Sequence, residues 1–313
     1  MAALNSAPNK PRAEMLRLMK RNAVVGLILT ALLHVSTWAA PMQYIYPPPE
    51  SGADVRMNFY WDILQLALDE TQSKWGPYEL QPSPKVMTPA RAEMQLGNSQ
   101  DISVMARTTS MEREKKLLPI RIPLDKGLTG YRLFLIKGIN QAAFSGIRGT
   151  SELRQFSIGQ AASWIDVDIL RYAGLDVVTG PTYESLFPML DAGRFDLFSR
   201  GVNEISAELA SNIPAYPDLT VEKKLVLYYP LPRYFFFPRT PEGEKLAQRA
   251  DEGIRLLVRN GKFQKRYLQF KKSILSDINL SGRRVIRIAN PTLSKETPLA
   301  DKELWDNLEA ELR

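Results

Sequence analysis

The side chains that could carry chemistry in this chain are carboxylates, lysines, arginines and tyrosines. The 313 residues contain no cysteine and one histidine, His34, which lies in an N-terminal segment that we expect to be cleaved off. Without histidine or thiol, Ser-His-Asp and Cys-His nucleophilic schemes and imidazole or thiolate metal sites are excluded. Disulfides are excluded as well. We therefore expect no metal and no cofactor, and any catalysis would have to rest on carboxylate, lysine or tyrosine side chains.

A pair of carboxylates is the remaining arrangement that we can test from spacing. Glycan-cleaving enzymes place two such groups about 5–9 Å apart. Asp166 and Asp168 lie on one expected helix, but residues two positions apart do not share a helix face. We find no other candidate pair, and we predict that the chain is not an enzyme.

The N-terminus has the pattern of a secretory signal. Five basic residues precede an apolar run at 23–33, and small residues follow at 36–40. We predict that residues 1–39 are the signal and that cleavage follows Ala39. An uncleaved anchor helix is the alternative, but the uncharged stretch at 22–40 contains His34, Ser36 and Thr37, and a spanning helix needs about 20 mostly apolar residues.

Removal of the signal changes the charge of the chain. The formal net charge is +7, and residues 1–39 hold five basic residues and one acid, so 7 − 4 leaves about +3. The sequence pI of about 9.4 therefore says little about nucleic acid, and we expect no nucleic-acid partner for an exported protein. The expected location is the periplasm.

Short apolar runs alternate with amphipathic segments, which predicts an α/β fold with largely parallel sheets. We expect strands at 42–47, 85–89, 101–106, 131–136, 155–159, 175–178, 195–198, 233–237 and 284–289. We expect helices at about 59–69, 90–96, 163–172, 182–192, 241–259 and 263–275. Thr240 as N-cap and Pro241 in the first turn mark one helix start clearly. The basic helix at 263–275 has an inner apolar stripe, so its charges are interpreted as a solvated face.

Several short strings occur in an order and at a spacing that resemble the type II periplasmic solute-binding proteins of polar amino-acid ABC importers. The resemblance covers roughly residues 44–275. It is carried by Tyr46-Pro-Pro-Pro-Glu50, Thr108-Thr-Ser-Met-Glu-Arg113, Ile158-Gly-Gln-Ala-Ala-Ser163, Leu190-Asp-Ala-Gly-Arg-Phe-Asp196 and two C-terminal helices interrupted at Asn260-Gly261.

This resemblance implies a fold of two Rossmann-like lobes with mixed, mainly parallel sheets, joined by a two-segment hinge. Residues 40–127 and 232–313 would form lobe one, and residues 128–231 would form lobe two. A small ligand would be held in the cleft between the lobes and buried as they close, in a protein that acts as a monomer.

The resemblance also implies ligand-binding residues. Arg113 matches the arginine that clamps the ligand carboxylate, and Thr108 matches a hydroxyl position of the same site. The turn formed by Ala161, Ala162 and Ser163 matches a loop whose backbone N–H groups bind that carboxylate, although the two alanines remove the usual hydroxyls. Tyr46 could line the cleft.

One departure from the family pattern concerns the ligand ammonium. The family holds it with an aspartate at the position of Gly201, which here follows Arg200. Either Glu204 or Asn203 replaces that carboxylate, or the ligand is not an α-amino acid. A second cation from Arg200 would favour an anionic ligand.

The predicted function is therefore that of an exported protein that clamps a small anionic or zwitterionic, amino-acid-like ligand for uptake through an ABC permease. Three alternatives stay open. The chain could sense a ligand for a membrane receptor, or it could be a scaffold that binds no small molecule. A carboxylate-based glycan-cleaving enzyme similar to the lytic transglycosylases is a third possibility, but it would require a catalytic domain that the remaining length does not provide.

Overall fold

The computed structural model describes residues 40–49 and 57–313, so the expected signal sequence at 1–39 lies outside the described residues. Within the described part, no helix is both long enough and apolar enough to cross a lipid bilayer. Residues 41–313 form one compact unit, to which the following description applies.

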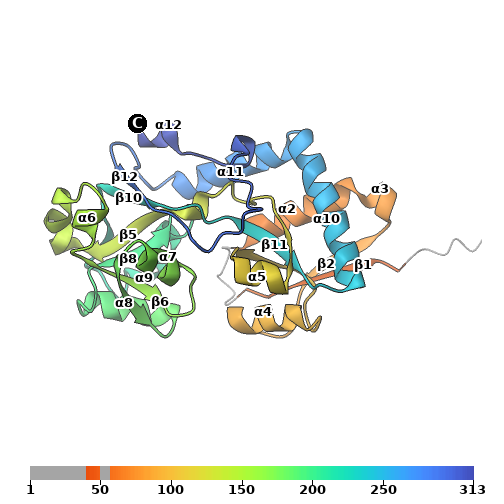
Figure 1. Ribbon diagram of the computed structural model, residues 1–313, viewed down its shortest axis with the longest axis horizontal. Helices are drawn as coiled ribbons and strands as arrows, with labels where there is room; N and C mark the ends of the chain where they lie inside the picture. Colours follow the sequence, from red (N-terminus) through yellow and green to blue (C-terminus); the bar gives the residue numbers. More distant parts are fainter. Residues whose placement is uncertain (1–39, 50–56) are drawn as a thin grey trace, which may run out of the picture. The chain divides into compact units, whose positions relative to one another are not determined.

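The first group of elements, which we call the first lobe, contains two small sheets that adjoin one another (Figure 1). Strand β1 is parallel to β2, and β11 is antiparallel to both β3 and β4. The backbone N–H groups of Ser103 and Val104 donate to the Ile45 carbonyl, at 2.8 and 3.2 Å, and so connect the two sheets. The strands are β1 (Met42–Tyr46), β2 (Tyr78–Pro82), β3 (Met105–Thr108), β4 (Leu118–Ile120) and β11 (Arg233–Phe237).

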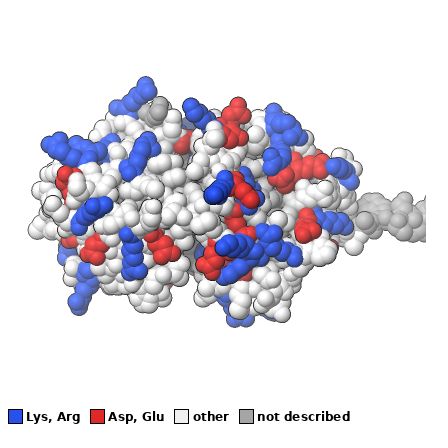
Figure 2. Space-filling model, viewed as in Figure 1, with Lys and Arg blue, Asp and Glu red and all other residues white. Residues whose placement is uncertain are grey.

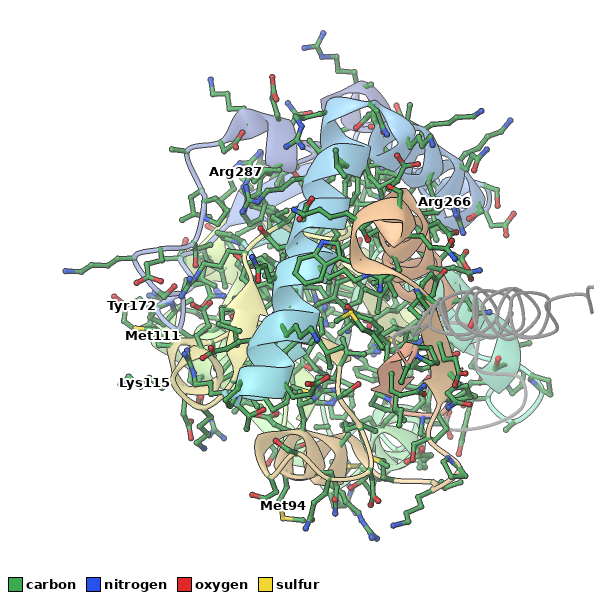
Figure 3. The ribbon with its side chains drawn as sticks, turned by 90° about the vertical axis from the view of Figure 1, so that its right-hand side faces the viewer. Met94, Met111, Lys115, Tyr172, Arg266 and Arg287 are labelled. Carbon is green, nitrogen blue, oxygen red and sulfur yellow. The ribbon has the colours of Figure 1, made fainter. Side chains whose placement is uncertain are left out.

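Helices cover these sheets, and the closest helix contact depends on a glycine. The helices are α2 (Asn58–Glu70), α3 (Gln72–Trp75), α4 (Pro89–Gly97), α5 (Met111–Lys116), α10 (Pro241–Arg259) and α11 (Lys262–Leu275). Helices α2 and α10 lie side by side (Figure 3), and a Cβ atom at Gly253 would lie 2.1 Å from the Ala67 carbonyl oxygen. Arg266 of α11 adds an ion pair to Asp62 of α2, at 2.6 Å.

The second lobe is built on a seven-stranded mixed sheet with the order β12-β10-β5-β8-β6-β7, and β9 pairs with β5. Strand β6 is parallel to β7 and β8, whereas β5 is antiparallel to β8, β9 and β10. The strands are β5 (Tyr131–Lys137), β6 (Ser157–Ala161), β7 (Asp176–Gly180), β8 (Leu197–Gly201), β9 (Leu219–Val221), β10 (Leu225–Tyr228) and β12 (Arg284–Arg287). The helices are α6 (Thr150–Leu153), α7 (Asp166–Tyr172), α8 (Tyr183–Asp191) and α9 (Ile205–Asn212).

Two adjacent segments, 125–130 and 229–232, connect the lobes, and the chain passes between the lobes again at 276–283, from α11 to β12. The two adjacent segments touch at Gly130, where an added Cβ would lie 2.2 Å from the Tyr229 carbonyl oxygen. Because only glycine fits so close a contact, Gly130 sets the spacing of the two connecting segments.

The 3₁₀ turns are η1 (Leu128–Gly130), η2 (Gly138–Gly146) and η3 (Lys302–Leu304).

The chain after β12 (dark blue in Figure 1) crosses both connecting segments and ends in the short helix α12 (Glu309–Leu312). The Asn290 side chain donates to the Pro230 carbonyl at 2.8 Å. The Asp306 N–H donates to the Lys126 carbonyl at 2.8 Å, and the Tyr131 hydroxyl donates to the Asp306 carbonyl at 3.3 Å. The C-terminal segment is therefore fastened to both connections.

The structure confirms the predicted mixed α/β fold and corrects three local predictions. The second strand is at 78–82 and not at 85–89, where Val86 is 76% exposed and a turn leads into α4. Strand β12 pairs in parallel with β10 in the second lobe, although the sequence grouped residues 232–313 with the first. Strands β9 and β10 and helix α9 were not predicted. The lobe boundaries otherwise stay a prediction.

A buried arginine allows a stability test of the first lobe. Arg249 of α10 is fully buried and donates to the carbonyls of Leu68, at 3.3 Å, and Gly76, at 2.9 Å. Replacement by methionine keeps the apolar stem but leaves these carbonyls without their donor, so we expect Arg249→Met to lower the free energy of unfolding by roughly 1–3 kcal/mol. Urea unfolding measures this difference.

The matched control is Arg255→Met on the same helix. Arg255 is 56% exposed and pairs only with Asp251, so we expect a change of about 0.5 kcal/mol or less. Equal losses for the two variants would show that the carbonyl contacts of Arg249 do not matter.

Candidate functional site

Six charged side chains lie where the ends of β5, β8 and β11 meet, and we call them the polar cluster. They are Arg132, Asp166, Arg200, Glu204, Glu208 and Arg233, and none is more than 15% exposed. Three are cations and three are carboxylates, so their formal charges cancel. Burial of charge at this depth is tolerated when each group has an oppositely charged or hydrogen-bonding partner.

Arg132, at the start of β5, is held by backbone and carboxylate acceptors. Its guanidinium lies 3.2 Å from an Asp166 carboxylate oxygen and donates to the carbonyls of Thr129 and Ser199, each at 3.1 Å. The Tyr229 hydroxyl donates to the same Asp166 oxygen at 2.5 Å, and burial raises the pKa of this tyrosine, which keeps it protonated. Two internal partners, Arg132 and Tyr229, therefore hold Oδ1 of Asp166.

Arg200, at the end of β8, is paired within the protein. Its Nε and Nη2 donate to the two carboxylate oxygens of Glu208, both at 2.5 Å, and Nη2 lies 3.1 Å from Glu204. The guanidinium lies over the ring of Trp164, 4.4 Å from its centroid. Because two carboxylates already neutralise Arg200, it does not present a free positive charge to an anion.

Glu204 occupies the space beside Gly201. The Gly201 N–H donates to the Glu204 carboxylate at 3.1 Å, and a Cβ at Gly201 would lie 3.1 Å from the same oxygen. Burial alone would raise the pKa of Glu204, but the guanidinium groups of Arg200, Arg132 and Arg233 outweigh it and lower that pKa. Glu204 is therefore ionised, with its carboxylate where a side chain at position 201 would begin.

Three buried polar atoms around the cluster lack a hydrogen-bond partner among the described residues. They are the side-chain oxygens of Gln160 and Asn203 in the second lobe and Nε of Arg233 in the first. The Asn203 oxygen would lie 2.6 Å from a Cβ at Gly201, and Arg233 is close enough to Glu204 to lower its pKa. Buried groups without partners are uncommon in proteins and mark positions that water or a ligand satisfies.

Two of the three ligand-binding residues expected from the first lobe, Thr108 and Arg113, are linked to Arg233 through β3. Thr108 is the direct partner of Arg233 in the β3–β11 register, and an Arg113 guanidinium nitrogen donates to the Thr108 carbonyl. The other end of the Arg113 guanidinium pairs with Glu93 of α4 at 2.8 Å. Arg113 thus lies in α5 beside the end of β3, but its guanidinium is paired with the Glu93 carboxylate.

The loop after β6 contributes fewer free amides than expected. The Ala162 N–H donates to the Gly180 carbonyl at 2.9 Å, and Ala161 ends β6 opposite Gly180. Ser163 is the remaining residue of the loop, and among the described residues no acceptor meets its N–H. The next residue, Trp164, brings the loop against Arg200.

Tyr46 ends β1 and stacks on Trp61 of α2, with ring centroids 4.3 Å apart. Trp61 stacks in turn on Phe235 of β11, at 6.0 Å. Burial raises the pKa of Tyr46, so its hydroxyl stays protonated. The rings of Tyr46, Trp61 and Phe235 therefore form one aromatic stack in the first lobe.

Sequence reasoning missed Arg132, Arg233 and Glu208. Arg132 and Arg233 each stand beside long apolar runs, in Tyr131-Arg-Leu-Phe-Leu and Arg233-Tyr-Phe-Phe-Phe. A charge within a buried strand signals an internal partner, and this pattern could have identified both residues. Glu208 has no comparable signal. No group of three or more acidic side chains that could hold a metal ion occurs in the part of the chain that the structure describes.

Solved structures similar to this chain share the type II periplasmic-binding-protein fold. An ancestral arginine-binding protein bound to arginine has a TM-score of 0.51 and 16% identity, over 74% of this chain and 99% of that one. A Salmonella typhimurium periplasmic binding protein with high arginine specificity has a TM-score of 0.51 and 15% identity, over 75% and 99%. A histidine kinase sensor domain has a TM-score of 0.50 and 16% identity, over 74% and 96%.

No protein-family model matches the chain, and no curated protein sequence matches it. The sequence identities to the solved structures are low, so these structures establish the fold only. The ligand of this chain has to be inferred from its own site residues. The predicted two-lobed binding-protein fold is confirmed.

The lowered pKa of Glu204 predicts a pH dependence of stability. A carboxylate whose pKa is lower in the folded state stabilises the fold above its unfolded pKa, about 4.3, and this contribution disappears as the pH falls through the folded value. We expect Glu204→Gln to be less stable than wild type at pH 7 by roughly 1–3 kcal/mol. Urea unfolding from pH 7 to pH 2.5 should show that this difference shrinks below about pH 4.

Glu244→Gln on the exposed side of α10 is the control, since it should change stability little at any of these pH values. A difference between wild type and Glu204→Gln that stays constant down to pH 2.5 would contradict the assigned ion pairs.

Proposed function

We propose that this chain is an exported solute-binding protein that holds a small zwitterionic, amino-acid-like molecule at the polar cluster. The observation that carries this proposal is that buried groups of both lobes next to the polar cluster lack partners: the oxygens of Gln160 and Asn203, and Nε of Arg233. A bound polar molecule would satisfy groups of both lobes at once and would favour their closed arrangement.

The charge balance favours a zwitterion over a simple anion. Each arginine of the cluster already has a carboxylate nearby, so the site offers no net positive charge to an anion. A zwitterion could place its ammonium against Glu204 and its carboxylate against Arg113 and the free Arg233 Nε. The face shown in Figure 2 also carries interspersed basic and acidic side chains, which suits a small ligand better than a polyanion.

The proposal also includes export of the protein to the periplasm and uptake of its ligand through a membrane permease. The basic, apolar and small-residue pattern at 1–39 supports export to the periplasm, and the shared fold is that of periplasmic amino-acid-binding proteins. An ABC permease would then receive the ligand. We continue to interpret the chain as a non-enzyme, because Asp166 is committed to Arg132 and Tyr229.

Ligand sensing is the second candidate, and one feature of the site favours it. A ligand carboxylate has to displace Glu93 from Arg113, and this competition lowers its affinity. Weak binding suits a sensor of an abundant solute, and a histidine kinase sensor domain shares the fold. Neighbouring genes for a permease and ATPase would support uptake, and a neighbouring receptor gene would support sensing.

A thermal-shift screen of the mature protein against zwitterionic amino acids, dicarboxylates and inorganic anions tests the proposal. A ligand present at 100 times its dissociation constant should stabilise the protein by about 2.7 kcal/mol. We expect stabilisation by a small zwitterion and none by the anions. If no solute of a broad set shifts the melting temperature, the scaffold alternative gains and the proposed function fails.

Two variants then test the role of Arg113, by calorimetry with the ligand from the screen. Arg113→Ala should weaken binding about tenfold or more, because it removes a charge-assisted hydrogen bond. Glu93→Gln should strengthen binding, because it removes the internal competitor. Arg91→Ala, an exposed arginine on α4, is the control and should bind as wild type does. Unchanged binding by Arg113→Ala would remove Arg113 from the site.

A further inference from the structure

The guanidinium of Arg200 is enclosed in the way a bound guanidinium ligand would be. Trp164, Tyr183 and Phe198 surround it, with ring centroids 4.4, 5.4 and 5.4 Å from its central carbon. Glu208 grips it through two hydrogen bonds, and the Arg200 side chain is 4% exposed. Aromatic faces combined with a two-point carboxylate contact form a specific binding site for a planar cation. We call these four residues the Arg200 cage.

The Arg200 cage adjoins Glu204, against which we place the ligand ammonium. One oxygen of Glu204 lies 3.1 Å from the Arg200 guanidinium and 3.1 Å from the Cβ position of Gly201. A cationic side chain of a ligand bound at Glu204 would therefore extend toward the space that Arg200 fills. The residue before Gly201 occupies a compartment that adjoins the ligand.

We propose that Arg200 determines ligand specificity by filling this cage as an internal substitute for a ligand guanidinium. The inference rests on the proposed function and narrows it. With the cage occupied, the site accepts zwitterions with short uncharged side chains and rejects arginine and other guanidinium compounds. Arg200 thus separates this chain from the arginine-binding proteins that share its fold.

A purely structural buried ion pair is the simpler account of Arg200, and the two accounts predict different behaviour of Arg200→Ala. Under both, the variant loses stability, because Glu208 keeps a buried charge without its partner. A free guanidinium compound could refill the vacated cage under both accounts, so chemical rescue tests only whether the cage accepts a free guanidinium. Only under our proposal does Arg200→Ala also gain binding of free arginine, and this gain separates the two accounts.

The experiment measures the melting temperature of wild type, Arg200→Ala and Arg171→Ala in guanidinium chloride and in methylammonium chloride, at equal concentrations too low to denature. Arg171 is an exposed arginine on α7 and serves as the matched control. We expect guanidinium to raise the melting temperature of Arg200→Ala alone and methylammonium to raise none, since it lacks the planar two-point contact. If guanidinium leaves Arg200→Ala unaffected or destabilises it as it does wild type, the proposal is overturned.

Arginine binding, measured by calorimetry well below the melting temperature of each variant, provides the second and deciding readout. Arg200→Ala should bind arginine about 100-fold more tightly than wild type does, and an unchanged affinity would overturn the proposal. Arginine binding to wild type as tight as that of the smallest zwitterion would overturn the proposal while leaving solute binding intact. Conversely, guanidinium rescue of Arg200→Ala without any solute that binds wild type would support the cage and overturn the proposed function.

Discussion

Buried arginines and carboxylates at the ends of β5, β8 and β11 neutralise one another, and this requirement shapes the region where the two lobes meet. A guanidinium or carboxylate at this depth costs several kcal/mol unless a partner is close. The sheet register provides those partners: Arg132 faces Gly201 across β5 and β8, which brings it to Asp166 and Glu204. The charge of Arg233, in the other lobe, also lowers the pKa of Glu204. The cluster therefore joins the lobes electrostatically at the place where their connecting segments meet.

This arrangement also explains why the site differs from a simple reading of the family pattern. An aspartate at position 201 would bring a second carboxylate against Glu204, since even a Cβ there would lie 3.1 Å from its oxygen. The carboxylate therefore comes from Glu204, in the turn that follows β8, and the absence of a side chain at Gly201 leaves room for it. Arg200 and Arg113 follow the same rule, because each meets an internal carboxylate where an external one was expected.

The connections between the lobes are more constrained than the two-segment hinge expected from the sequence. Gly130 and Tyr229 bring the two segments into direct backbone contact. The C-terminal segment then crosses both, through Asn290 and Asp306, and Trp305 packs against Gly127 in the space that a Cβ would occupy. Any rotation of one lobe against the other has to carry this third segment with it, so the segment restrains opening and closing.

Local periodicity, caps and composition were enough to predict the α/β class and most of the helices, and the absence of cysteine excludes thiol chemistry. The resemblance to binding proteins also selected Thr108, Arg113, Arg200 and Glu204 as candidate site residues, and this assignment stays a prediction. The sequence did not reveal β2, whose side chains are only partly buried, or the position of β12, which depends on pairing with a strand 59 residues earlier in the register. Only the tertiary structure decided which charges meet. The partners of Arg113, Arg132 and Arg200 come from other elements, and local sequence holds no signal for a contact that forms only when those elements pack.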